Sequence, residues 1–135
     1  MKTPEEIVML MYDNDEFSSL LGVQINEVSK GSIQLSLKLQ EKHTNGFKIA
    51  HGGICYSLAD TCLAFVANTF GFKAVSVETS ISHLVKVQIG DLLLAKSHLI
   101  HKGNSSAVFV VEIHNQENRL VAHFKGSVRI SADLW

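Results

Sequence analysis

Proline, cysteine and net charge are all scarce in this chain of 135 residues. Pro4 is the only proline, and no repeat or low-complexity tract interrupts the sequence, so we find no linker between domains. The formal net charge is -1, and the 12 Lys and Arg residues are scattered, whereas nucleic-acid binding needs a clustered basic surface. With 46% hydrophobic residues, the sequence predicts a single globular domain over residues 1–135.

A signal-peptide pattern and a membrane-length apolar run are also missing. The N-terminus has no basic segment followed by an apolar one. The most apolar stretch, residues 54–70, falls short of about 18 uninterrupted apolar residues and contains Asp60. Cys55 and Cys62 are too far apart on one predicted helix to form a disulfide there. We therefore expect a cytoplasmic protein with reduced thiols and no membrane association.

Capping and periodicity signals predict an α+β fold with a short N-terminal helix and an antiparallel sheet of about six strands. Thr3-Pro4-Glu5-Glu6 is a capping box that predicts a helix over 4–12, and a further turn is expected near 16–21. Short turns between strands predict that consecutive strands pair antiparallel. The alternation of polar and apolar residues predicts strands at about 23–29, 33–39, 74–85, 91–102, 105–115 and 119–130.

A long apolar helix predicted over 54–70 lies at the centre of this arrangement. Asp60 is the only charged residue between His51 and Lys73. A carboxylate in a helix that is apolar on nearly every face should be neutralised, paired or functional. One helix covers only one face of a six-stranded sheet, and the last strands have apolar residues on both faces. We therefore predict a dimer that joins sheets edge to edge or packs helix against helix.

The residues around this helix form a motif. Asn45-Gly46 precedes His51-Gly52-Gly53, and Leu58-Ala59-Asp60-Thr61 follows. The motif resembles that of the acyl-CoA thioesterases of the phenylacetic acid degradation (PaaI) type, and the resemblance covers almost the whole chain. It implies the hotdog fold, in which an antiparallel sheet wraps one long helix, and hydrolysis of an aryl-acyl or medium-chain acyl-CoA to acid and CoA. It also implies sites at a dimer interface, dimers that often pair into homotetramers, and no cofactor, since CoA is part of the substrate.

Gly52 and Asp60 have the properties that thioester hydrolysis needs. At the start of a helix, the free N–H of Gly52 and the helix dipole can stabilise an oxyanion. Asp60 can attack the carbonyl or act as a general base, and apolar neighbours should raise its pKa. Eight residues along one helix span about 12 Å, too far for one carbonyl to contact both groups. We therefore predict that Asp60 of one subunit faces Gly52 of the other.

Four further residues of the motif are candidates for supporting roles. The resemblance implies that Asn45 and His51 help place the thioester or the water. His51 could instead fix the loop by donating from its ring to a backbone carbonyl. Thr61 could hydrogen-bond within the site or to the backbone four residues earlier. We expect Gly53 to have a steric role in substrate binding and no catalytic one.

The chain departs from the family pattern at residues 83–87. Relatives often carry a basic residue followed by proline there, whereas this chain reads His83-Leu84-Val85-Lys86-Val87. The proline is absent, and the positive charge lies one position later. Lys86 is therefore the candidate contact for the CoA phosphates, as a point charge. The carrier, CoA or acyl carrier protein, stays open.

Two other functions are alternatives. A non-catalytic acyl-CoA-binding module has little reason to keep an acid in an apolar helix. A hotdog dehydratase or hydratase pairs a histidine with an acid at a different spacing, which this sequence does not contain. The seven histidines are spread over the loop and the strands without a tight cluster, so we predict no metal site.

Overall fold

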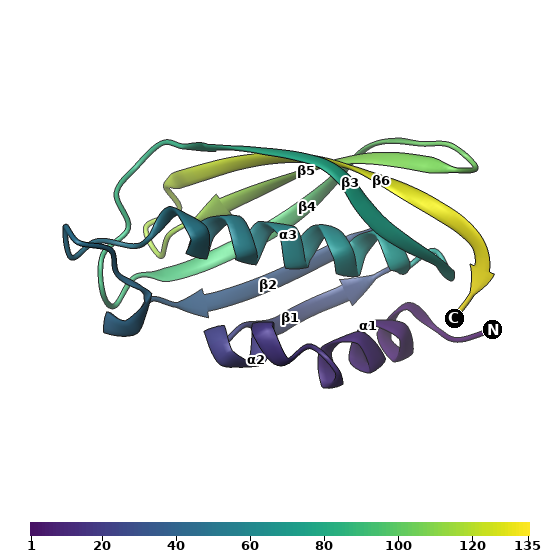
Figure 1. Ribbon diagram of the computed structural model, residues 1–135, viewed down its shortest axis with the longest axis horizontal. Coiled ribbons are helices and arrows are strands. Elements are labelled where there is room, and N and C mark those ends of the chain that lie inside the picture. Colours follow the sequence, from purple (N-terminus) through teal and green to yellow (C-terminus); the bar gives the residue numbers. More distant parts are fainter.

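A 17-residue helix, α3 (Gly52–Asn68), lies in the curve of a six-stranded antiparallel sheet in the computed structural model, which describes residues 1–135 (Figure 1). Two short helices, α1 (Pro4–Asp13) and α2 (Glu16–Leu21), precede the sheet, and the capping box predicted at Thr3 and Glu6 is present. No helix is both long and apolar enough to span a bilayer. The remaining elements are β1 (Gln24–Ser29), β2 (Ser32–Lys38), the 3-10 helix η1 (Glu41–His43), β3 (Phe72–His83), β4 (Leu92–Lys102), β5 (Ser106–His114) and β6 (Leu120–Leu134).

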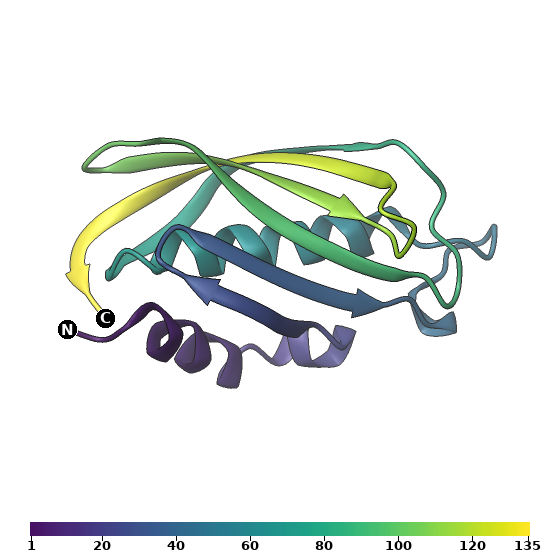
Figure 2. The ribbon, with the colours of Figure 1, turned by 180° about the vertical axis from the view of Figure 1, so that it is seen from behind.

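The strands follow the order β1-β2-β4-β5-β6-β3, and every neighbouring pair is antiparallel (Figure 2). The predicted pairings of β1 with β2, β4 with β5 and β5 with β6 are confirmed. The predicted pairing of β3 with β4 is wrong, because β3 pairs with β6 and β2 with β4. The connection 84–91 does not turn back on itself. It crosses the end of the sheet, where Val121 C=O accepts from the N–H of Leu84 and Val85.

The ends of several elements differ from the predicted bounds, most clearly those of α3 and β6. Helix α3 begins two residues early, at Gly52, because His51 caps it, and it ends at Asn68 with Thr69 as its cap. Strand β6 runs to Leu134, four residues further than predicted, because Phe72 at the start of β3 pairs with Leu134. The pairing between β3 and β6 therefore lengthens β6, and the local sequence does not indicate this.

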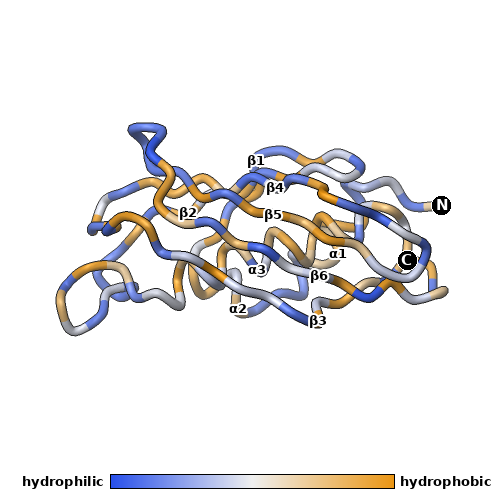
Figure 3. The backbone as a smooth tube through the Cα atoms, turned by 90° about the horizontal axis from the view of Figure 1, so that it is seen from above, coloured by the Kyte–Doolittle hydropathy of each residue, from blue (hydrophilic) through white to orange (hydrophobic).

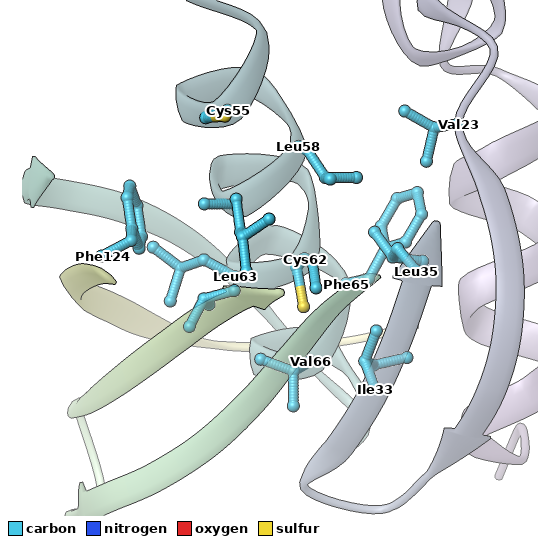
Figure 4. Packing of buried hydrophobic residues seen from close by; sticks show 14 of the residues in the cluster. Val23, Ile33, Leu35, Cys55, Leu58, Cys62, Leu63, Phe65, Val66 and Phe124 are labelled. Atoms are coloured by element: carbon cyan, nitrogen blue, oxygen red, sulfur yellow. The ribbon is translucent and has the colours of Figure 1, made fainter. Parts of the chain in front are cut away.

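The core lies between α3 and the concave face of the sheet (Figure 4). Leu63 faces Phe124 on one side of the helix, and Phe65 faces Leu35 on the other. Along β5, alternate residues are buried, and hydrophobic colour marks much of this central strand (Figure 3). Helix α1 buries Ile7 and closes the side of α3 towards β1. This packing fixes the rotation of α3, and so fixes which of its residues stay outside the core.

Gly126 in β6 leaves room for the side chain of Leu63 from α3. A Cβ added there would overlap Leu63 and lie 3.2 Å from Phe124 and 3.3 Å from Thr79. We expect Gly126→Val to lower the free energy of unfolding by about 1–3 kcal/mol through overpacking, measured by urea denaturation. Adding Leu63→Ala should recover part of this loss. Gly103→Ala, where a Cβ meets only ordinary contacts, is the control, and an equal stability of Gly126→Val and wild type would contradict the packing.

Candidate active site at the start of the central helix

His51 determines where α3 begins. Its ring Nδ1 accepts a 2.9 Å hydrogen bond from Gly53 N–H, and its carbonyl accepts one of 2.9 Å from Ile54 N–H. The expected ring donation to a backbone carbonyl is therefore wrong in direction. An accepting Nδ1 leaves the neutral ring with its proton on Nε2. The cap leaves Gly52 N–H, at the first helical position, without an acceptor in the chain.

The loop before α3 is held by the side chain of Asn45 and by backbone hydrogen bonds. Asn45 Oδ1 accepts from Phe47 N–H at 2.9 Å and from Ile49 N–H at 3.4 Å. His51 N–H donates to His43 C=O at 2.9 Å, and Ala50 N–H donates to Val87 C=O at 2.8 Å. Asn45 therefore builds the turn with its oxygen.

The buried ring of His43 anchors the same loop. Its Nδ1 accepts from Gln40 N–H at 2.9 Å, and the side chain is only 3% exposed. Burial, together with the positive charge of Lys42, lowers the pKa of His43. The ring is therefore neutral at physiological pH and acts as a fixed support for the segment that delivers His51.

A cavity of about 320 Å³ opens at the start of α3. Its wall combines the end of the loop, the first turn of α3 and the connection after β3, which Figure 1 shows at the same end of the molecule. The lining is mostly apolar, with His51, His83 and Lys86 as its polar members. The lining residues are Ile49, Ala50, His51, Gly52, Cys55, His83, Leu84, Val85, Lys86 and Val87.

Asp60 lies two turns further along α3 and does not line this cavity. Its carboxylate is half-buried and takes part in no ion pair, since the ion pairs of the chain join His98 and His114 to Glu112. Burial raises the pKa of Asp60 above its ordinary value. A raised pKa without a structural partner is typical of a functional acid, although structural acids can share it.

Cys55 is the one potential thiol nucleophile in the cavity wall. The thiol is buried, and this burial raises its pKa to about 11. It is therefore protonated near neutral pH and unsuited to nucleophilic attack, because the thiolate is the reactive form. Both cysteines are free, as predicted.

Comparison with known proteins identifies the family. A family profile described as thioesterase superfamily matches residues 47–122. The acyl-coenzyme A thioesterase PaaI of Escherichia coli strain K12 is 34% identical over 116 residues, which cover 86% of this chain and 83% of that protein. The chain belongs to the thioesterase superfamily.

Solved structures confirm the hotdog fold and the PaaI-type resemblance of this thioesterase-superfamily chain. The E. coli PaaI structure superposes with a TM-score of 0.94 at 30% identity, and the match covers 97% of this chain and 95% of that chain. A Streptococcus mutans UA159 protein, solved bound to acetyl CoA, has a TM-score of 0.81 at 26% identity over 84% of this chain and 91% of its own.

The structure of this superfamily member brings some of the predicted site residues together and keeps others apart. His51, Gly52 and Lys86 line one cavity, with Gly53 beside them held by the His51 ring. Thr61 turns away from it, because its Oγ1 lies 3.2 Å from Ser18 Oγ on α2. No group of three or more His, Cys, Asp or Glu side chains has metal-binding geometry.

His83 is the cavity residue that sequence reasoning missed. Nε2 of its ring lies 3.2 Å from the position that a Cβ on Gly52 would occupy. In the sequence it reads as an isolated histidine of a strand. Its only local signal is that it opens the segment where the chain departs from the family pattern.

Replacing Asp60 by Asn should stabilise the fold at neutral pH. The folded state holds the Asp60 proton more tightly than the unfolded chain, so the fold loses stability as pH rises from the unfolded pKa of about 3.9 through the raised folded value. We expect a higher Tm for Asp60→Asn than for wild type at pH 7, and a difference that narrows towards about pH 4. Asp133→Asn, at an exposed position, is the control. A lower Tm for Asp60→Asn at pH 7 would show that the carboxylate has a stabilising partner.

Proposed function

We propose that this protein is an acyl-CoA thioesterase whose active site combines Gly52 of one subunit with Asp60 of another. The observation that carries the proposal is that two groups on one helix lack a partner within the chain. The N–H of Gly52 has no acceptor in the chain, and the half-buried Asp60 has no ion-pair partner. An N–H donor and a carboxylate are the two groups that hydrolysis of a thioester needs.

A second copy of the chain can bring an Asp60 carboxylate close to Gly52. Gly52 and Asp60 lie about 12 Å apart along α3, and Asp60 is absent from the cavity wall. One side of α3 is not covered by the sheet, and small residues such as Ser57 and Ala64 flank Asp60 there (Figure 1). Small residues allow a second helix to approach closely. An antiparallel pair of α3 helices about a twofold axis would place each Asp60 near the partner's cavity.

The exposed edge of the sheet favours the same assembly. Strand β3 has a neighbour on one side only, and its Val75 and Val77 are 65% and 63% exposed. An exposed edge with apolar side chains is a template for pairing with another chain. We propose a dimer that joins these edges, and a dimer of dimers as the larger homotetramer.

The chemistry follows from these positions. Asp60, as general base, takes a proton from water while the water oxygen bonds to the thioester carbon. Alternatively, the carboxylate attacks the carbon itself, and water then hydrolyses the resulting anhydride. In both routes Gly52 N–H stabilises the oxyanion, the carbon–sulfur bond breaks as the oxyanion collapses, and the CoA thiolate leaves and takes up a proton. The raised pKa of Asp60 makes it a stronger base than an exposed aspartate.

The cavity lining supports an acyl-CoA substrate. Leu84, Val85 and Val87 provide an apolar surface suited to an aryl or medium-chain acyl group. Lys86 is exposed at the same cavity and can meet a CoA phosphate. A relative of similar fold was solved bound to acetyl CoA, which supports the choice of carrier. We assign Asn45 to holding the loop and His51 to holding the start of α3. Gly53 supports this cap through its N–H, and Thr61 supports the packing of α3 against α2 through Ser18. The free thiols fit action in a reducing compartment such as the cytoplasm.

The two alternative functions have less support. A dehydratase would need a histidine beside an acid, whereas the cavity that contains His51 and His83 has no Asp or Glu in its lining within the subunit. A binding module would gain nothing from the desolvated carboxylate of Asp60.

Replacing Asp60 by Asn should abolish hydrolysis. We expect kcat on a panel of aromatic and aliphatic acyl-CoA thioesters to fall by about 10³-fold or more, with CoA binding largely retained, because the amide keeps the shape and loses the base. Release of free thiol measures the rate, and calorimetry with CoA measures binding. Glu112→Gln on the outer face of the sheet is the matched control, with unchanged rates expected. Undiminished turnover in Asp60→Asn would refute the mechanism, and no turnover by wild type on any thioester would refute the function.

A further inference from the structure

We propose that His83 is a second catalytic donor to the thioester carbonyl oxygen, beside Gly52 N–H. The inference deepens the proposed function and rests on it. His83 lies outside the sequence motif of residues 45–61. It is at the end of β3, 31 residues after Gly52 in the chain.

The register of the sheet turns His83 towards α3. His83 pairs with Ala122 of β6, and Ala122 is fully buried. Directly opposed residues of an antiparallel pair lie on the same face of the sheet. The neighbouring pair, Ser82 with His123, is exposed on the other face. His83 therefore points into the concave side, where it lines the cavity with Gly52.

The distance to Gly52 is suitable for a shared acceptor. Nε2 of His83 lies 3.2 Å from an ideal Cβ on Gly52. A Cβ lies about 2.5 Å from its own backbone nitrogen, so the Gly52 nitrogen and Nε2 are less than about 6 Å apart. One oxygen placed between them can accept hydrogen bonds of about 2.9 Å from both. Two donors converging on one oxygen are the usual composition of an oxyanion site.

The ring is free to take this role. No hydrogen bond or ion pair within the chain engages its nitrogens, whereas His51 is committed to the helix cap. A neutral imidazole with its proton on Nε2 is a hydrogen-bond donor at that atom. The ring also covers the Cα of Gly52, so a larger residue at position 52 would displace the second donor. The absence of a side chain at Gly52 thus serves His83 as well as the substrate.

Two substitutions separate a donor from a space-filling ring. His83→Phe keeps an aromatic ring without a donor, and His83→Gln keeps a neutral N–H donor without the ring. We expect kcat for acyl-CoA hydrolysis to fall about 10²-fold in His83→Phe, with KM changed by less than about threefold, and His83→Gln to recover about tenfold of that loss. His123→Gln, on the opposite face of the adjacent pair, should match wild type. Wild-type kcat in His83→Phe, or an equal loss in both His83 variants, would overturn the proposal.

A binding measurement separates this inference from the proposed function. In a ketone analogue of an acyl-CoA, a methylene group replaces the thioester sulfur and the carbonyl is retained. We expect this analogue to shift the imidazole ¹⁵N signals of His83 and to leave those of His123 unchanged. If the analogue binds and the His83 signals do not shift, the proposed role of His83 is overturned even when the enzyme is active. A wild-type protein that hydrolyses no thioester would overturn the proposed function, and the shift would still decide whether His83 meets the carbonyl.

Discussion

The hydrogen bond from Gly53 N–H to Nδ1 of His51 is the interaction on which the rest of the site depends. It sets the first residue of α3 and leaves Gly52 N–H free at the positive end of the helix dipole. The support behind it is continuous, because His51 N–H is held by the carbonyl of His43, whose neutral ring is buried. A weaker cap would let the first turn fray, and the donor would lose its direction.

Asp60 imposes the opposite kind of constraint, because its burial opposes folding while it favours catalysis. The sheet covers the apolar residues of α3 and leaves the side of Asp60 half-open. This carboxylate has no ion-pair partner within the subunit. Functional sites commonly keep such unpaired charged groups at the expense of stability. In the proposed dimer both the open side of α3 and the exposed edge of β3 lie in the interface. The same assembly therefore accounts for the unpaired acid and for the unpaired strand edge.

Local patterns in the sequence predicted the helices and strands. They did not predict the features that depend on pairing between distant strands. The capping box at Thr3 and the position of Gly52 at the start of the central helix depend on residues only a few positions away, so those predictions hold. The pairing of β3 with β6 depends on how the connection 84–91 crosses the end of the sheet, which no local period encodes. The position of His83 follows from that same register. A strand histidine could therefore not be assigned to the cavity from the sequence.

Complementation between two inactive variants tests the composite site most directly. Gly52→Pro removes the free N–H at a position where proline suits the first turn, and the extended backbone of His51 is compatible with it. The added ring also crowds His83, so this variant disables both proposed donors of its own cavity. Asp60→Asn removes the base. After subunit exchange of an equal mixture, each mixed dimer holds one site with both native residues, so the account predicts recovery of about a quarter of wild-type kcat. Mixed dimers that form and stay inactive would contradict a site built from two subunits.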